Sequence, residues 1–229
     1  MTKWLGVVVA VLVVLAAGLW LALRAPDIPF ETLEGKYAAD GDSRFVDLPG
    51  GIRLHYRDQG DPAAPLLLLL HGYGDSFTTW EGWVRALKGR FHILSLDFPG
   101  HGLTRAPADY RLRGDDLADL VEVFAERLKL PKFALAGNSM GGGAAWRFAV
   151  RHPDRLNALI LVDAAAFAPS GAPQKLPLAF KILQYSWGRA LLAGIDSAPL
   201  IRQGAGGEPL LEQLRQPAEV LGLAQRPLQ

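Results

Sequence analysis

The pattern of apolar and polar positions divides the chain of 229 residues into four parts. Residues 1–24 contain a continuous apolar run, and residues 25–42 are charged and interrupted by prolines and glycines. Residues 43–163 alternate between short apolar runs and stretches with apolar side chains at helical spacing, whereas residues 164–229 are weakly patterned. The pattern predicts a membrane anchor helix, a linker, a folded core and a less regular tail.

Within residues 43–163, short apolar runs predict strands and a 3.6-residue period predicts helices. The run from Leu66 to Leu70 is apolar at every position, which is typical of a central strand buried on both faces of a mostly parallel sheet. A β-hairpin is expected around Pro49–Gly51, further strands at 132–137 and 159–162, and helices at 76–87, 115–130 and 139–151. This alternation predicts an α/β fold with helices on both faces of the sheet.

The tail differs from the core in composition. Residues 164–229 contain seven prolines, no threonine and few β-branched residues, so no strand is expected there. An amphipathic helix is predicted within 178–195, and the glycine-rich stretch 202–207 predicts a flexible break.

The N-terminal run is long enough to cross a membrane. The residues from Trp4 to Leu23 carry no charge and match the roughly 30 Å of a hydrocarbon core. Leu21–Ala25 is a poor signal-peptidase site, which favours an uncleaved single-pass anchor over a cleaved signal peptide. The flanking charges, Lys3 and Arg24, barely discriminate between the two orientations, and a periplasmic or extracytoplasmic domain is slightly preferred.

Charge and composition narrow the function classes. The net charge is +1 without a basic stripe, so a nucleic-acid partner is not expected. The absence of cysteine excludes disulfides, thiolate metal sites and a cysteine nucleophile. No Asp, Glu and His cluster has metal-ligand spacing and no phosphate-binding loop is found, so no cofactor is indicated. The oligomeric state is not predicted.

The stretch Gly137-Asn138-Ser139-Met140-Gly141 interrupts an apolar run and leads into helix-compatible sequence. Gly-x-Ser-x-Gly at a strand-to-helix turn is typical of a nucleophile elbow, because only glycines can pass so close to the strained serine. The same five letters also arise by chance in glycine-rich chains, and this chain has 25 Gly. The motif is therefore weak by itself.

Two further motifs lie at the ends of predicted strands. His71-Gly72-Tyr73-Gly74 follows the central strand, and Asp97-Phe98-Pro99-Gly100-His101-Gly102 follows the next apolar run. Ligands of α/β sheets bind at these carboxyl ends. With Trp80 a few residues on, the three ordered motifs make residues 43 to about 200 resemble the α/β-hydrolase family, in its serine-hydrolase branch with His-Gly-x-Gly.

The resemblance implies roles for several residues. Ser139 is the expected nucleophile, and the backbone N–H groups of Tyr73 and Met140 are the expected oxyanion donors. Gly72, Tyr73 and Trp80 are candidate substrate-binding residues, although Trp80 is equally compatible with a core position. A helical lid inserted after residue 163 would cover the site in this family, so residues 164–229 are expected to hold a partial lid and an irregular tail.

The other polar residues of these motifs are expected to be structural. His71 is expected to brace its loop, and Asp97 and His101 to organise the loop that contains them. His55, on the hairpin, is expected at the surface or at a sheet edge.

The acid and the base of a catalytic triad are not found. The only histidine after Ser139 is His152, and thirteen helical residues place it roughly 20 Å away. Asp163, at a strand end, is a weak candidate acid, and a capping role for it is favoured. The last core strands of the family are also not recognised, so we expect the chain to be a fragment or to carry a shifted reading frame near Gly204.

The sequence therefore predicts a membrane-anchored serine hydrolase acting on carboxylic esters or related small apolar acyl substrates. Serine at the elbow argues against the branches of the family that use aspartate there, such as epoxide hydrolases and haloalkane dehalogenases. Serine-dependent branches that cleave carbon–carbon bonds or act as cofactor-free haloperoxidases stay open. The alternative is a catalytically inactive, membrane-tethered binding module.

Overall fold

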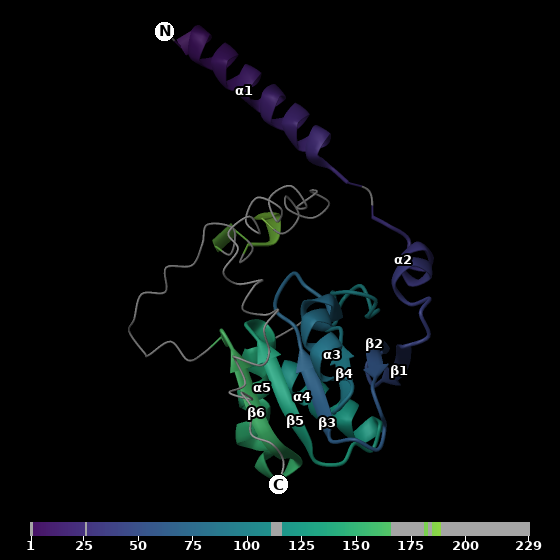
Figure 1. Cartoon of the computed structure of the whole chain (residues 1–229). Coiled ribbons are helices and arrows are strands. Elements are labelled where there is room, and N and C mark those ends of the chain that lie inside the picture. The colour runs from purple at the N-terminus through teal and green to yellow at the C-terminus, as the bar shows by residue number, and fades with distance from the viewer. Residues whose placement is uncertain (1, 26, 111–115, 166–180, 183–184, 189–229) are drawn as a thin grey trace. The chain divides into compact units, whose positions relative to one another are not determined.

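The computed structural model describes residues 2–25, 27–110, 116–165, 181–182 and 185–188 (Figure 1). They fall into two compact units, which are considered separately. Residues 2–25, 27–29, 181–182 and 185–188 belong to the first unit, and residues 30–110 and 116–165 to the second. The predicted break at 202–207 and most of the predicted helix 178–195 lie outside the described residues.

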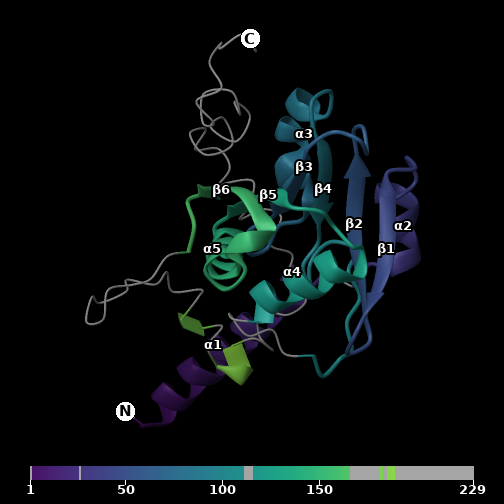
Figure 2. The same ribbon diagram turned by 90° about the horizontal axis from the view of Figure 1, so that it is seen from below.

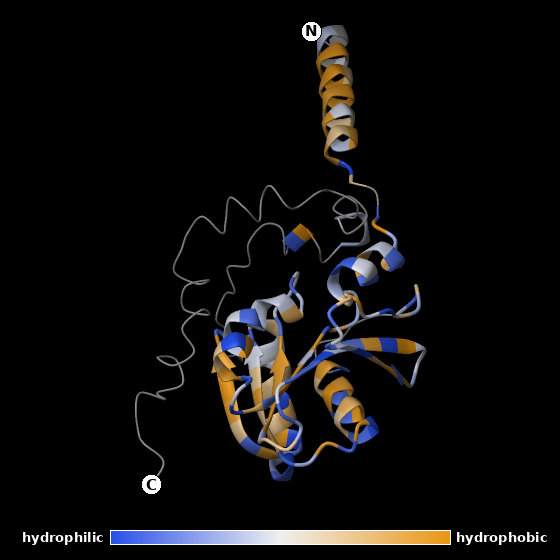
Figure 3. Ribbon diagram, turned by 45° about the vertical axis from the view of Figure 1, so that its right-hand side comes forward, coloured by the Kyte–Doolittle hydropathy of each residue, from blue (hydrophilic) through white to orange (hydrophobic). Residues whose placement is uncertain are grey.

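Helix α1 (Thr2–Leu23) is the main element of the first unit. Its segment Gly6–Leu23 has a mean hydropathy of 2.8, which its mostly orange colouring in Figure 3 reflects, and its side chains are not buried. By length and composition it is able to cross a membrane, a property that it shares with N-terminal signal sequences. The Arg24 guanidinium lies 4.9 Å from the centre of the Trp20 ring, at the end of the apolar run.

The second unit is built on one six-stranded sheet in the order β1-β2-β4-β3-β5-β6 (Figures 1 and 2). Its strands are β1 (Ser43–Leu48), β2 (Ile52–Gln59), β3 (Leu66–Leu70), β4 (His92–Leu96), β5 (Phe133–Asn138) and β6 (Leu156–Val162). Strands β4, β3, β5 and β6 run parallel, and the hairpin β1–β2 pairs antiparallel with β4. The predicted mostly parallel sheet is thus confirmed.

Helices cover both faces of the sheet. The helical turn η1 (Phe77–Trp80) leads into α3 (Glu81–Leu87) on one face, whereas α4 (Asp116–Arg127) and α5 (Met140–Arg151) pack on the other. Leu68 and Leu70 of β3 join the core beneath α4 and α5, and Leu67 and Leu69 join the core beneath α3. Burial on both faces explains why this strand is apolar at every position.

The structure refines two predicted elements. The helix predicted at 76–87 is split into η1 and α3, and β6 begins at Leu156, three residues earlier than predicted. The segment predicted as a linker contains helix α2 (Phe30–Tyr37), which begins with Glu31 in its first turn and has Lys36 in its last, as the helix dipole favours.

Helix α2 is held on the core by charged contacts. Glu34 accepts hydrogen bonds from Arg105 at 2.7 Å and from Arg53 at 3.3 Å, and the Arg105 guanidinium lies 4.6 Å from the centre of the Phe30 ring. Arg57 donates to the carbonyl oxygen of Tyr37 at 3.3 Å. The partners lie far along the chain, so local pattern alone did not predict that this segment docks.

Candidate active site

The turn between β5 and α5 is a strained elbow. Ser139 has φ +47° and ψ −110°, a region that residues with a Cβ rarely occupy, and its side chain is exposed. A Cβ on Gly137 would lie 2.3 Å from the carbonyl oxygen of Gly141, and a Cβ on Gly141 would lie 2.4 Å from that of Leu70. The two glycines of the motif are therefore sterically required.

Backbone hydrogen bonds fix Ser139 from the side of β6. Its N–H donates to the carbonyl oxygen of Val162 at 3.0 Å, and its carbonyl oxygen accepts from Gly143 at 2.9 Å and from Ala165 at 2.8 Å. The strained conformation is thus held by the end of the neighbouring strand and by the residues that follow it.

The loop after β3 lies against this elbow. A Cβ on Gly72 would be 2.8 Å from Asn138 Oδ1 and 3.4 Å from Ser139 Cβ, so the loop passes close to the elbow at this residue. Tyr73 follows directly, and Met140 is the first residue of α5, where a backbone N–H has no carbonyl partner within its own helix. The structure therefore brings together the serine and the two segments expected to supply oxyanion donors.

His71 braces this loop, as predicted. The Phe98 N–H donates to His71 Nε2 at 2.9 Å, so Nδ1 carries the proton and donates to the carbonyl oxygen of Gly72 at 2.7 Å. Burial lowers the pKa of His71 below its usual value, which agrees with a neutral ring. The histidine thereby ties the loop after β3 to the loop after β4.

Asp97 ties the same two loops together from the opposite direction. The side chain is fully buried, and its carboxylate accepts from the backbone N–H groups of Phe77 at 2.7 Å and Leu103 at 2.9 Å. His55 Nδ1 approaches the same carboxylate at 2.8 Å. A Cβ on Gly102 would collide with the carboxylate. The expected role of Asp97 as a loop organiser is therefore confirmed.

The expectation that His55 lies at the surface is wrong. Its side chain is fully buried, between the ring of Phe45 at 5.0 Å and that of Phe77 at 5.5 Å. Its Nε2 lies 3.0 Å from Ser43 Oγ, while Nδ1 faces Asp97. Phe77 and Asp97, which lie outside the hairpin, cover this face of β2. The alternation of apolar and polar residues within the hairpin does not show that they do so.

All five histidines lie in the described part of the chain, and none is hydrogen-bonded to Ser139 there. The ring nitrogens of His55 and His71 are all engaged with other partners. His92 Nε2 lies 2.7 Å from Asp58 Oδ1, at the start rather than the carboxyl end of β4.

The two remaining histidines differ in their distance from the elbow. His152 follows the last residue of α5, so the length of the helix separates it from Ser139. His101 Nδ1 lies 3.2 Å from the carbonyl oxygen of Pro99, the local backbone contact expected of it, and its ring is 5.7 Å from that of Tyr73. No histidine in the described residues forms a hydrogen bond with Ser139, the contact that a general base would make.

The other predicted site residues are placed as follows. Asp163 comes directly after β6, is exposed and has φ +44°. Trp80 is fully buried in the core beneath α3, 5.0 Å from the ring of Trp83, so it has no surface that a substrate would touch in this conformation. Tyr73 exposes about half of its surface, 55%.

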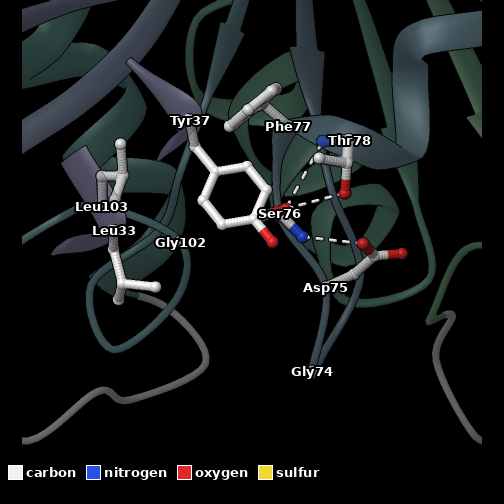
Figure 4. Close-up of a pocket in the computed structure, with 9 residues that line it drawn as sticks. All are labelled: Leu33, Tyr37, Gly74, Asp75, Ser76, Phe77, Thr78, Gly102 and Leu103. Carbon is white, nitrogen blue, oxygen red and sulfur yellow. Dashed lines mark hydrogen bonds between the residues drawn. The ribbon is translucent and has the colours of Figure 1, made fainter. Parts of the chain in front are cut away.

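A cavity of about 380 Å³ lies beside the loop after β3, which is expected to supply an oxyanion donor (Figure 4). It is formed by α2, by the segment that continues from Tyr73 and by the loop after β4, and its lining residues are Leu33, Tyr37, Gly74, Asp75, Ser76, Phe77, Thr78, Gly102 and Leu103. The cavity was not predicted from the sequence, because residues 25–42 were expected to form a linker. The apolar spacing of Phe30, Leu33 and Tyr37 is the signal that would have indicated a docked helix.

Comparison with known proteins identifies relatives of two kinds. The chain is 33% identical over 133 residues to epoxide hydrolase 3 of Xenopus tropicalis, covering 56% of this chain and 35% of that protein. It is 32% identical over 121 residues to 2-hydroxymuconate semialdehyde hydrolase of a Pseudomonas strain, covering 52% and 42% respectively. The chain thus spans less than half the length of these curated relatives.

Solved structures agree with this relationship. The crystal structure of a membrane phospholipase A matches with a TM-score of 0.60 at 26% identity, over 100% of this chain and 77% of that chain. An epoxide hydrolase from metagenomes of hot environments matches with a TM-score of 0.51 at 30% identity, over 53% and 42%. The profile of the alpha/beta hydrolase fold matches residues 65–204, which is more than half of the chain. The chain therefore belongs to the alpha/beta hydrolase fold family.

Proposed function

We propose that the chain carries the nucleophile and oxyanion half of a membrane-anchored serine hydrolase acting on carboxylic esters or related apolar acyl substrates. The observation that carries the proposal is the exposed Ser139 at φ +47° with the Gly72 loop packed against it. A strained, exposed serine at the carboxyl edge of a parallel sheet is the geometry of an acyl-transfer nucleophile.

In the proposed reaction, Ser139 Oγ attacks the carbonyl carbon of the ester and forms a tetrahedral intermediate. The backbone N–H groups of Tyr73 and Met140 would stabilise its oxyanion, assisted by the N-terminal dipole of α5. Collapse of the intermediate releases the alcohol and leaves an acyl-serine, which water hydrolyses. The serine proton must pass to a base and then to the leaving alcohol, and the described residues place no histidine for that step.

Several features of the site favour esters over epoxides, although epoxide hydrolases are among the relatives. A serine hydroxyl attacks a carbonyl carbon and gives an acyl ester, whereas the family branches named above for epoxides use a carboxylate at the elbow. Two preorganised backbone donors are also matched to an oxyanion. The membrane phospholipase A is an ester hydrolase by name and matches along the whole of this chain, which supports the same choice.

The competing proposal is a binding module that has lost its chemistry. The placement of the histidines favours it, because removing one member of a catalytic triad costs several orders of magnitude in rate. The elbow and the proposed oxyanion loop favour the enzyme instead, because a binding module would not need the close backbone contacts that require glycine at Gly137 and Gly141.

The two proposals are distinguished by hydrolysis of p-nitrophenyl butyrate by the purified, detergent-solubilised chain, compared with Ser139→Ala. The hydrolase proposal predicts turnover that is lost in the variant, together with fluorophosphonate labelling of Ser139 located by peptide mass spectrometry. Equal rates in both proteins and no labelling would support the binding module. Labelling that persists in Ser139→Ala would place the nucleophile elsewhere.

A further inference from the structure

The cavity of about 380 Å³ continues directly from the proposed oxyanion loop. Gly74 lines it and is the neighbour of Tyr73, while Gly72 on the other side of Tyr73 touches the elbow at Ser139. Adjacent Cα atoms are 3.8 Å apart. The cavity therefore begins one or two residues along the chain from the backbone N–H of Tyr73, where the carbonyl of a substrate would bind in the proposed reaction. A group attached to that carbonyl is therefore within reach of the cavity.

One side of the cavity is apolar. Leu33 and Tyr37 lie four residues apart on α2 and present the same helix face to it, and Figure 4 shows the Tyr37 ring extending across its centre. Phe77 and Leu103 complete the apolar lining. Burying an alkyl chain against these side chains is favourable in proportion to the apolar area removed from water.

The polar side of the cavity carries negative charge only. Among the nine lining residues there is no Lys, Arg or His, and Asp75 is the single charged group. One oxygen of Asp75 accepts from the N–H of Ser76 at 2.8 Å, and the hydroxyls of Ser76 and Thr78 bond each other at 2.8 Å. The lining therefore holds one carboxylate and no cationic side chain, so an anionic group is disfavoured in the cavity.

The apolar wall exists only while α2 is docked. A helix of eight residues with a central glycine, Gly35, is not stable alone in water. The contacts of Glu34 with Arg53 and Arg105 hold it in place, and only six residues join it to the end of α1. The wall of the cavity thus belongs to the segment directly after the proposed membrane anchor.

We propose that this cavity receives an uncharged alkyl or acyl chain of the substrate, with Leu33 and Tyr37 limiting the length of that chain. The proposal rests on the proposed function of Ser139 and adds a substrate class to it, namely neutral long-chain esters in preference to substrates with an anionic group on that chain. α2 is then a specificity element supplied by the segment next to the anchor.

Photo-crosslinking tests this occupancy without requiring turnover. The detergent-solubilised chain is irradiated with a dodecanol that carries a diazirine at its far end, and the modified peptides are identified by mass spectrometry. We expect modification of the peptides containing α2 and residues 74–78. Leu33→Trp fills the cavity and should reduce this modification about tenfold, whereas Thr32→Trp, on the exposed side of the same helix, should leave it unchanged.

The charge preference is tested with a fatty acid that carries a hydroxyl at one end and the diazirine beside its carboxylate at the other, at a pH where the carboxylate is ionised, so that charge and label enter the cavity together. Asp75→Asn keeps the oxygen that accepts from Ser76 and removes the charge. It should raise modification by the fatty acid about threefold or more relative to the alcohol. An equal response of the two probes would overturn the claim that the cavity excludes anions.

The crosslinking results are separable from the proposed function, because Ser139→Ala should not change them. Cavity crosslinks that persist without any Ser139-dependent hydrolysis would support the cavity proposal and contradict the hydrolase. Ser139-dependent hydrolysis whose chain-length preference is the same in Leu33→Trp and Thr32→Trp, with crosslinks located elsewhere, would support the hydrolase and overturn the cavity proposal.

Discussion

The two sides of Ser139 differ in how tightly they are held. We call the loops that follow β3 and β4 the β3–β4 flank, and strand β6 with the outer part of helix α5 the β6 flank. On the β3–β4 flank, His71 and Asp97 are fully buried, and each hydrogen-bonds to backbone groups of the opposite loop. On the β6 flank, the apolar side chains of Leu159 and Leu161 are 38% and 46% exposed. Val150, on the adjacent helix α5, is 73% exposed.

This difference coincides with a division of the chemistry. The β3–β4 flank contains the Gly72–Tyr73 loop, and the elbow contains Ser139 and Met140, so the proposed nucleophile and the proposed oxyanion donors are held in position. On the β6 flank, the acidic group next to the elbow among the described residues is Asp163, in an exposed position directly after β6. In the proposed mechanism, the half of the site that binds charge in the transition state is therefore the half that buried hydrogen bonds hold in place.

The elbow should respond most strongly to substitution, because it is packed against backbone that cannot move aside. Gly141→Ala would place a Cβ 2.4 Å from the carbonyl oxygen of Leu70, and we expect a loss of about 3–5 kcal/mol of stability or no folded protein. Gly89→Ala, with no atom within 4 Å of its Cβ, is the matched control and should be nearly neutral. Urea unfolding at fixed detergent concentration measures both, and equal midpoints would contradict the steric assignment.

The buried carboxylate should rank next. Asp97→Asn leaves the side-chain volume unchanged but replaces one of two acceptor oxygens by a donor, opposite N–H groups of Phe77, Leu103 or His55. Leaving a buried polar group unsatisfied and removing a charge-assisted bond should cost about 2–4 kcal/mol. Asp154→Asn, on an exposed turn, is the control. A loss of less than 1 kcal/mol, roughly that of one ordinary hydrogen bond, would mean that the network is not what holds the two loops.

How much of the site could be predicted from the sequence depends on how far apart the interacting residues lie in the chain. The elbow and its strained serine follow from Gly137 and Gly141, because local sterics dictate which residues fit. The strand from Leu66 to Leu70 follows from its continuous apolar run. These features depend on neighbours in the chain, and the structure has them as predicted.

The features that were missed depend on contacts distant in sequence. Docking of α2 requires Arg53 and Arg105, which lie 19 and 71 residues from Glu34. The burial of His55 likewise requires Asp97, 42 residues away. A single sequence does not show which distant residues pair, so the apolar spacing of α2 indicates a docked helix but not the cavity that it helps to form.

A smaller change in the free energy of unfolding is expected from the protonation of His71. It should make the stability of the β3–β4 flank depend on pH. Burial holds the folded-state pKa of His71 below its unfolded value of 6.5. The unfolded chain therefore binds the proton more readily, and this contribution to stability is complete above pH 6.5 and declines as the pH falls towards the folded pKa. His71→Gln should lower stability at pH 8 and flatten the dependence of stability on pH between pH 8 and 5, whereas Gly89→Ala, which changes no titratable group, should not flatten it. A variant with the wild-type pH dependence would show that another group is responsible.

The smallest effect is expected on the β6 flank. Leu161→Lys changes a side chain that is 46% exposed, and exposed substitutions away from special features usually alter stability by less than about 0.5 kcal/mol. The lysine should also reduce self-association, because a charge on an exposed, apolar outer strand discourages pairing between sheets.

Urea unfolding measures the change in stability, and sedimentation measures self-association. The contrasting variant is Leu69→Lys, on the fully buried strand β3, which should not fold. If Leu161→Lys were as damaging as Asp97→Asn, the β6 flank would be as tightly packed as the loops on the other side of Ser139, and the contrast between the two flanks would be wrong.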